Sequence, residues 1–300
     1  MPETAVADAA TGIPLKELAR RHGLSSSGRL LGPLEYARQV WGYRYFITAH
    51  AKAKTVSTLG TTNLGTLWQV LTPAINALVY YVIFGVIIGT GANNPNFIPY
   101  LCIGVFVFGF TQSTVSQGVN SITGNLGLIR ALHFPRASLP LSAALVEIRN
   151  FITATGVLLI IVLLCHEPIT VQWLLIFPVM LLQSLFNFGL AMGGARLGST
   201  FRDIKQLVPF IMRFWMYGSA VLYPVTRFTH AHALQGWKLH LIEANPMLVF
   251  VELYRHSLME GQELVGTPKM LWIEGVIWAV VVGTAGFLYF WRGEKGYGRG

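Results

Sequence analysis

Residues Leu139–Cys165 read LPLSAALVEIRNFITATGVLLIIVLLC, and this run decides the fold class. It is longer than the roughly 20 residues that an α-helix needs to cross a bilayer. Apolar and polar residues do not alternate along it, as they would in a transmembrane β-strand. Because a backbone in lipid must satisfy its own hydrogen bonds, the run predicts a transmembrane helix.

Five further runs share this character, so the chain contains six predicted transmembrane helices. In chain order the six are Trp68–Gly89, Phe97–Val119, Leu139–Cys165, Val171–Leu197, Ile204–Val225 and Met270–Trp291. The composition agrees, since 53% of the 300 residues are hydrophobic and 12% are charged. Soluble domains carry roughly twice that charged fraction. The composition therefore excludes an ordinary soluble enzyme, a disordered chain and a nucleic-acid-binding domain.

The basic residues are divided unequally between the two sides of the predicted bundle. Sixteen of the 22 Lys and Arg residues fall in the N-terminal segment, in the loops between spans two and three and between spans four and five, and in the tail. Four fall on the opposite side. Lys and Arg stay on the cytoplasmic side of a membrane, so we expect both termini there. The predicted segments are a polar cytoplasmic segment (1–33), an amphipathic interface helix with its connection (34–66), a six-helix transmembrane domain (67–291) and a cytoplasmic tail (292–300).

The segment Leu34–Val56 differs from the spans that follow it. Aromatic residues are interleaved with basic ones, including Arg38 and Arg44, and the segment is too charged to cross a bilayer. We interpret it as an amphipathic helix at the membrane interface. A soluble helix packed on a partner is the alternative.

The long outer loop from Thr226 to Lys269 contains a helical pattern. Apolar residues recur at helical spacing over Met247–Met259. This helix either lies on the outer membrane surface or re-enters the membrane. Re-entry requires that protein or a water-filled cavity cover the backbone.

Catalytic and metal-binding motifs are absent from the sequence. With only Asp8 and Asp203, no Asp-x-Asp pair exists, and without a Gly-Lys dipeptide there is no phosphate-binding loop. His230, His232 and His240 lack carboxylate or Cys partners at metal-ligand spacing, so we expect no metal site. Active transport by this chain would draw its energy from a gradient or from a partner protein.

Three charged residues and two cysteines lie within or near the predicted spans. Charged residues inside a membrane are costly and point to function. Glu147 and Arg149 fall early in a long span and can face water, whereas Arg213 lies among apolar neighbours. We hypothesise a structural Glu147–Arg213 pair. Cys102 and Cys165 are interpreted as small apolar core residues, with one disulfide between them as the alternative.

Short motifs in a fixed order give the chain a family resemblance. They are Leu64-Gly65-Thr66-Leu67-Trp68, Leu128-Ile129-Arg130, Phe134-Pro135-Arg136, Leu139-Pro140, Phe201-Arg202-Asp203, Tyr223-Pro224, Asn245-Pro246 and Glu252-Leu253-Tyr254-Arg255. Together they resemble the membrane-spanning subunit of ABC exporters for polysaccharides, the O-antigen, teichoic acid and galactan permeases. The residues 58–63 depart from the family, which usually has a basic, Tyr-containing stretch there.

The resemblance implies an ABC type 2 exporter fold with re-entrant helices in the last outer loop. It further implies a homodimer in the bacterial cytoplasmic membrane, working with two copies of a cytoplasmic ABC ATPase that binds ATP and Mg. The cargo would be a lipid-linked polysaccharide, and this chain would be no enzyme. A permease without its own ATPase needs a rigid cytoplasmic element through which the partner ATPase transmits its conformational change. We interpret Asn125–Arg136 as this coupling helix, with an ordinary basic loop as the alternative. Its expected contact residues are Leu126, Leu128, Ile129, Arg130, His133, Phe134 and Arg136.

Two further sets of residues are expected to meet a lipid-linked glycan. Aromatic faces for sugar rings would come from Tyr80, Tyr81, Phe106, Phe110, Phe214, Trp215 and Tyr217. Interfacial belts and helix packing are the alternative for each of these. The lipid pyrophosphate would meet Arg38, Arg44 and Arg202, although binding to the lipid surface explains these arginines equally well.

Three other functions remain open on the sequence. A gradient-driven transporter predicts inverted repeats and titratable groups in mid-membrane, and Glu147 is the one firm candidate. A membrane-embedded glycosyltransferase predicts clustered carboxylates, for which two Asp residues are too few. A scaffold protein is the third. A neighbouring reading frame that encodes an ATPase would settle the class.

Overall fold

The computed structural model describes residues 31–60, 67–87, 89, 96–201, 203–223, 244–261 and 264–297. Every regular element within these ranges is a helix, which confirms the predicted all-α class. Among the described residues, four helical segments are long and apolar enough to cross a membrane. They are α6 (Phe97–Ser121), α8 (Ser138–Leu164), the continuous η4 (Val171–Leu175) and α9 (Ile176–Thr200), and α14 (Pro268–Arg292). These match the second, third, fourth and sixth predicted spans.

The first and fifth predicted spans correspond to shorter helices. α5 (Leu67–Tyr80) runs on into a π-helical segment, η1 (Tyr81–Ile87). α10 (Ile204–Gly218) has 15 residues, or about 22 Å, against roughly 30 Å of hydrocarbon. The prediction that this helix extends to Val225 is wrong, because the chain turns after Gly218 and Ala220 takes a positive φ of 50°.

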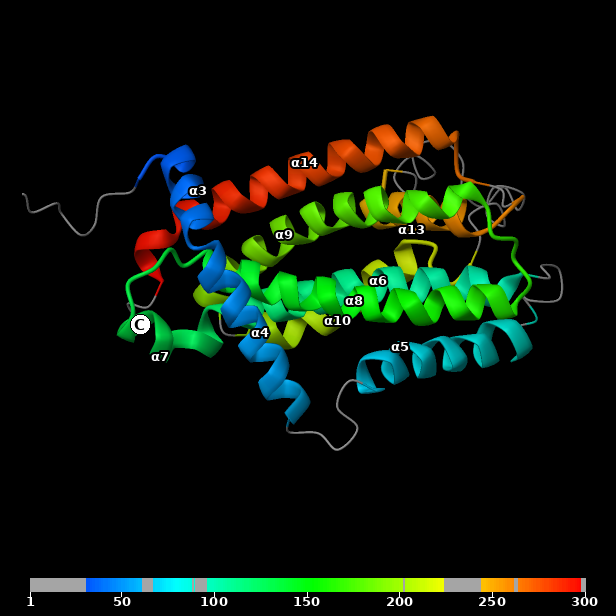
Figure 1. The fold of residues 1–300 in the computed structure, drawn as a ribbon, viewed down its shortest axis with the longest axis horizontal. Coiled ribbons are helices and arrows are strands. Elements are labelled where there is room, and N and C mark those ends of the chain that lie inside the picture. The colour runs from blue at the N-terminus through cyan, green and yellow to red at the C-terminus, as the bar shows by residue number, and fades with distance from the viewer. Residues whose placement is uncertain are drawn as a thin grey trace, which may run out of the picture.

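Small residues let the central helices approach closely. Gly118 of α6 lies against the backbone of Ala191 in α9, where an added Cβ would come within 2.6 Å of the Ala191 Cα. Gly189 on α9 faces the backbone of Val282 and Gly283 in α14 in the same way. Such contacts are typical of membrane helix pairs. They make α6, α9 and α14 a closely packed core (Figure 1).

The helix predicted over Met247–Met259 is present as α13 (Pro246–Leu258). Asn245 caps it, since its side chain accepts a hydrogen bond from the Met247 N–H at 3.0 Å. Nearly all of its residues are buried, because α6, α9, α14 and η4 surround it. The helix therefore lies inside one end of the bundle rather than on its surface, and we call this end the outer end because the predicted topology places it outside.

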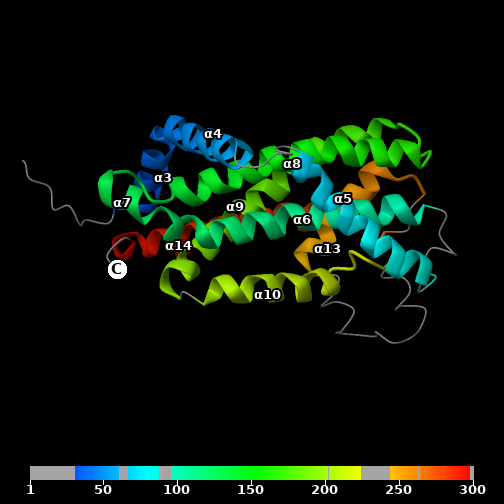
Figure 2. The same ribbon diagram turned by 90° about the horizontal axis from the view of Figure 1, so that it is seen from below.

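The opposite end of the bundle gathers three segments that are distant in sequence. α3 (Pro33–Gly42), α7 (Leu126–Ala131) and the C-terminal end of the chain lie together there, while α13 lies toward the other end (Figures 1 and 2). The single helix predicted over Leu34–Val56 is instead two helices, because α3 ends at Gly42 and α4 (Arg44–Gly60) begins after Tyr43. Glycine is a poor helix former, which favours the break at this place.

Candidate functional site

A cavity of about 630 Å³ lies between α5, α6, α8 and α10. This volume is within the range of roughly 300–1,000 Å³ found for small-molecule sites. Aromatic rings and side chains with hydroxyl or amide groups line it together. The cavity is therefore polar on one part of its wall, although the helices that form it are apolar.

The α5 wall is a stripe of four residues with a spacing of four. Trp68, Thr72, Asn76 and Tyr80 all line the cavity. Residues four apart share one face of a helix, so the stripe follows directly from the sequence. Of the four, only Tyr80 is among the predicted glycan-binding residues. The polar residues Thr72 and Asn76, at this spacing within an apolar run, were the signal for the rest of the stripe.

The α6 wall changes character along the helix. Phe106, Phe108 and Phe110 line its outer half, and the polar residues line the half nearer α7. The polar set is Gln112, Ser113, Ser116 and Gln117. A ligand in the cavity would meet hydrogen-bonding groups at the α7 end and aromatic faces farther along the bundle.

Two of the three intramembrane charges line the cavity. Glu147 on α8 is buried, and Asn150 donates a hydrogen bond to its Oε2 at 3.2 Å. Arg213 on α10 also lines the cavity, whereas Arg149 is exposed elsewhere on α8. The hypothesised Glu147–Arg213 ion pair does not form, because Arg213 lies on an exposed face of α10 while Glu147 is buried beside Lys54 of α4.

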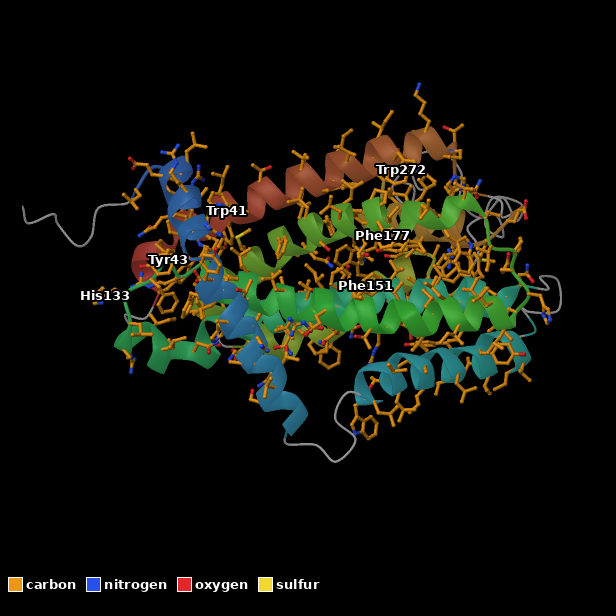
Figure 3. The ribbon with its side chains drawn as sticks, viewed as in Figure 1. Trp41, Tyr43, His133, Phe151, Phe177 and Trp272 are labelled. Carbon is orange, nitrogen blue, oxygen red and sulfur yellow. The ribbon has the colours of Figure 1, made fainter. Side chains whose placement is uncertain are left out.

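The predicted glycan-binding aromatics divide into two groups. Tyr80, Phe106 and Phe110 line the cavity, and Phe110 stacks on Phe151 with ring centroids 4.5 Å apart. Figure 3 shows Phe151 inside the bundle. The other predicted residues lie off the cavity wall. They are Tyr81, Phe214, Trp215 and Tyr217, of which Phe214 is 79% exposed.

Trp215 serves the packing of α10. Its indole N–H donates to the Asn245 Oδ1 at 3.0 Å, and its ring packs edge-on against Phe108. The side chain therefore joins α10 to α6 and to the start of α13. The packing alternative holds for this residue.

The predicted coupling segment presents only part of itself to solvent. Ile129 is buried against the bundle, so it is not available to a partner protein. Leu126, Leu128 and Phe134 are partly buried in the same cluster. The exposed side chains are Arg130, Ala131, Leu132 and His133, and Figure 3 shows His133 at the tip of this end. A short amphipathic helix must turn one face inward, which the sequence alone did not orient.

Arg136 belongs to a set of contacts at the C-terminal end, here called the C-terminal latch. Glu294 accepts from the Tyr36 hydroxyl at 2.7 Å and from the Arg136 N–H at 3.0 Å. The Tyr36 oxygen in turn accepts from the Ala137 N–H at 3.1 Å, and the Arg136 guanidinium donates to the Glu294 carbonyl. The latch joins α3, the segment after α7 and η5 (Glu294–Gly296), which follows α14. Nothing in the local sequence of these residues predicted it.

The interface helices expose an aromatic and basic surface. Arg44 lies over the rings of Tyr45 and Trp41, at 4.6 and 5.9 Å from their centroids. Arg38 is exposed on α3, and Trp41 is 71% exposed. Such a surface suits the headgroup region of a membrane. The predicted partner residue Arg202 lies outside the described residues.

A buried charged cluster, here called the Arg255 cluster, fastens α13 to the outer end. Arg255 is fully buried and pairs with Glu252 at 2.9 Å. It also donates to the carbonyl oxygens of Tyr100, Ala220 and Val221 at 3.2, 3.3 and 3.0 Å. Arg255 falls within the predicted outer loop, Thr226 to Lys269. The i, i+3 spacing of Glu252 and Arg255 was the signal for their pairing.

Metal and disulfide chemistry find no support in the described part of the chain. No group of three His, Cys, Asp or Glu residues lies close enough there to hold a metal ion. Cys102 and Cys165 are free thiols, so the alternative disulfide is not formed. The outer-loop histidines His230, His232 and His240 lie outside the described residues.

Comparisons with known proteins agree with this architecture. Residues 46–259 match the family model "ABC-2 type transporter". The chain is 24% identical to the O-antigen export system permease protein RfbA of Myxococcus xanthus over 82% of this chain and 94% of the relative. It is 25% identical to RfbA of Klebsiella pneumoniae, covering 73% and 82%. It is also 25% identical to the polysialic acid transport protein KpsM of Escherichia coli, covering 67% and 76%. Since the family model covers more than half of the chain, this protein belongs to the ABC-2 type transporter family.

Proposed function

We propose that this chain is the transmembrane subunit of an ATP-driven exporter that moves a lipid-linked polysaccharide across the bacterial cytoplasmic membrane. The observation that carries the proposal is the cavity lining, which combines aromatic faces with a row of hydroxyl and amide groups. Aromatic rings offer apolar faces to sugar rings, and hydroxyl and amide groups both donate and accept hydrogen bonds. The printed functions of the relatives, O-antigen export and polysialic acid transport, support the same class of cargo. O-antigen, teichoic acid and galactan precursors all have this chemistry.

A homodimer gives the cavity its second wall. α5 and α10 flank it at one edge of the bundle and carry large exposed apolar residues. These include Leu78, Val79, Phe210, Ile211 and Phe214, and Val82 of the adjoining η1 is exposed as well. A second copy packed on this edge would cover them and enclose a wide path lined by two cavities. Lipid alone would leave the polar stripe of α5 facing hydrocarbon, which is unfavourable.

The proposed topology has six spans with both termini in the cytoplasm. α5 with η1 and α10 would complete the four longer spans, and α13 would re-enter from the outer side. The exposed arginines Arg38, Arg44 and Arg130 all lie at the end that holds α3 and α7, in accord with the positive-inside rule. Trp41 and Arg44 would then lie among headgroups, where they and Arg202 would meet the lipid pyrophosphate.

The energy would come from two copies of a cytoplasmic ABC ATPase that binds ATP and Mg. The exposed residues Arg130, Leu132 and His133 form the surface that we propose as its docking site. Leu132 is 51% exposed and is the apolar centre of this surface. An apolar residue ringed by polar ones is typical of an interface centre.

Co-purification with the ATPase tests this proposal. We expect Leu132→Asp to abolish association with the ATPase, because a charge would replace the apolar centre of the docking surface. Ile169→Asp is the matched control, since Ile169 is 73% exposed at the opposite end. Retained association in Leu132→Asp, or equal loss in Ile169→Asp, would refute the docking surface. A wild-type chain that never retains an ATPase or moves a glycan would refute the function.

A further inference from the structure

The inward face of α4 connects the proposed docking end to the cavity. α4 runs beside α8 from the region of α7 toward α5 (Figures 1 and 2). Phe46, His50 and Lys54 follow one another at intervals of four residues, so they share this inward face. Each of the three contacts a different part of the bundle.

The first contact lies at the docking end. The ring of Phe46 packs against Phe134 with centroids 4.8 Å apart, and Phe134 follows α7 directly. The next residue on the face, His50, hydrogen-bonds to the Ser142 hydroxyl at 2.9 Å. A displacement of the segment after α7 would therefore press first on α4.

The last contact lies at the cavity. The Lys54 ammonium donates to the Gln117 Oε1 at 3.1 Å, and Gln117 lines the α7 end of the cavity wall. Burial lowers the pKa of Lys54, and the nearby carboxylate of Glu147 opposes that change. Glu147 lines the cavity as well. The distance along α4 from Phe46 to Lys54 is about 12 Å, or two helical turns.

We propose that Lys54 is a positioning residue that links the segment after α7 to the inner mouth of the cavity. Through α4, a movement at Phe134 shifts the Lys54 ammonium and with it Gln117 and the electrostatic field at Glu147. The polar end of the cavity thus changes when the ATPase moves the docking end. The inference rests on the proposed function, because it assumes a partner that moves that end.

Reconstituted exporter complexes test the link. Lys54→Met keeps an unbranched apolar side chain and removes the ammonium, and Lys54→Arg restores a cation. Lys52→Met is the matched control, since Lys52 is exposed on the same helix. We expect Lys54→Met to assemble and to keep basal ATP turnover, while its stimulation by the lipid-linked glycan falls about tenfold, the size expected for a lost charged hydrogen bond. Lys54→Arg should recover most of the stimulation, and Lys52→Met should match the wild type.

Four results would overturn the inference. Three concern stimulation of ATP turnover by the glycan: full stimulation in Lys54→Met, an equal loss of stimulation in Lys52→Met, and no recovery of stimulation in Lys54→Arg. The fourth is loss of complex assembly or of basal ATP turnover in Lys54→Met, which would assign Lys54 to folding. A second measurement needs no glycan. A cysteine introduced by Ser116→Cys in the cavity should change its maleimide labelling rate when the ATPase binds ATP, and Lys54→Met should abolish that change.

These two measurements separate failure of the inference from failure of the proposed function. A wild-type complex that hydrolyses ATP but ignores the glycan contradicts the function, while the labelling rate still decides the role of Lys54. A labelling rate that responds to ATP equally in wild type and Lys54→Met contradicts the link alone.

Discussion

Replacing Arg255 by methionine should destabilise the outer end of the bundle strongly. Methionine retains much of the apolar stem but removes the guanidinium from a site with no exposed surface. Glu252, which is 3% exposed, would lose its ion-pair partner and remain buried as a lone charge. The carbonyls of Tyr100, Ala220 and Val221 would lose a donor as well.

The expected loss in the free energy of unfolding has two parts, one from the unpaired buried charge of Glu252 and one from the carbonyls that lose their donor. Breaking a buried ion pair from one side costs about 3–5 kcal/mol. Removing both partners takes away the lone charge, so Glu252→Leu combined with Arg255→Met should recover most of that loss. The orphaned carbonyls should keep a residual cost of about 1–3 kcal/mol in the double variant.

Thermal unfolding of the detergent-solubilised protein measures both variants. At roughly 2 °C per kcal/mol for a chain of this size, the single variant, which bears both costs, should unfold about 8–16 °C below wild type, and the double variant about 2–6 °C below. Arg149→Met is the control, because Arg149 is exposed, and its midpoint should not change. A single variant within 2 °C of wild type, or a double variant less stable than the single, would refute the assignment.

Three other predictions concern separate regions. Burial raises the pKa of Glu294 above its ordinary value of 4.5, so its ionisation opposes folding as pH rises through the raised pKa. The unfolding midpoint of the wild type should therefore fall as pH rises above about 4.5, whereas that of Glu294→Gln should change less; parallel profiles would contradict this. Gly189→Ala should separate α9 from α14 and lower the midpoint. Gly193→Ala, with open space around it, should add up to about 1 kcal/mol of helix propensity and raise the midpoint by up to about 2 °C; equal effects would disprove the close contact. A membrane-impermeant maleimide applied to whole cells at pH 8.5 should label the half-buried Cys165 and spare the buried Cys102; labelling only after lysis would reverse the proposed orientation.

Long apolar runs made most of the fold predictable. The run that includes Leu139–Cys165 became α8 almost residue for residue, because nothing but a helix satisfies such a backbone in lipid. α13 was predictable as well, because its apolar residues recur at helical spacing. The end of α10 was not, because the turn after Gly218 depends on carbonyls that Arg255 binds from another part of the chain.

The candidate site was predictable only in part. Tyr80, Phe106 and Phe110, named as aromatic faces for sugar rings, and Glu147 and Arg213, named as charges within spans, do line one cavity. The orientation of each helix about its own axis comes from tertiary packing. A helix such as α10 is apolar on most of its surface, so its sequence does not say which aromatic residues face inward.

Distant contacts between short segments were beyond local patterns. The Tyr36–Glu294 hydrogen bond joins residues 258 positions apart. The Lys54–Gln117 contact joins an interface helix to a span. Both depend on how α3 and α4 fold back over the bundle, which follows from the break at Tyr43 and not from hydrophobicity.

Reconstitution into vesicles with the partner ATPase tests the central claim most directly. Transfer of a radiolabelled lipid-linked glycan to the far leaflet would be measured with ATP, without ATP, and with Asn76→Leu and Gln112→Leu in the cavity wall. The account predicts ATP-dependent transfer that these two variants reduce at least about tenfold while the complex stays assembled. ATP-dependent transfer that is unchanged by both variants, or no transfer by an assembled wild-type complex, would contradict it.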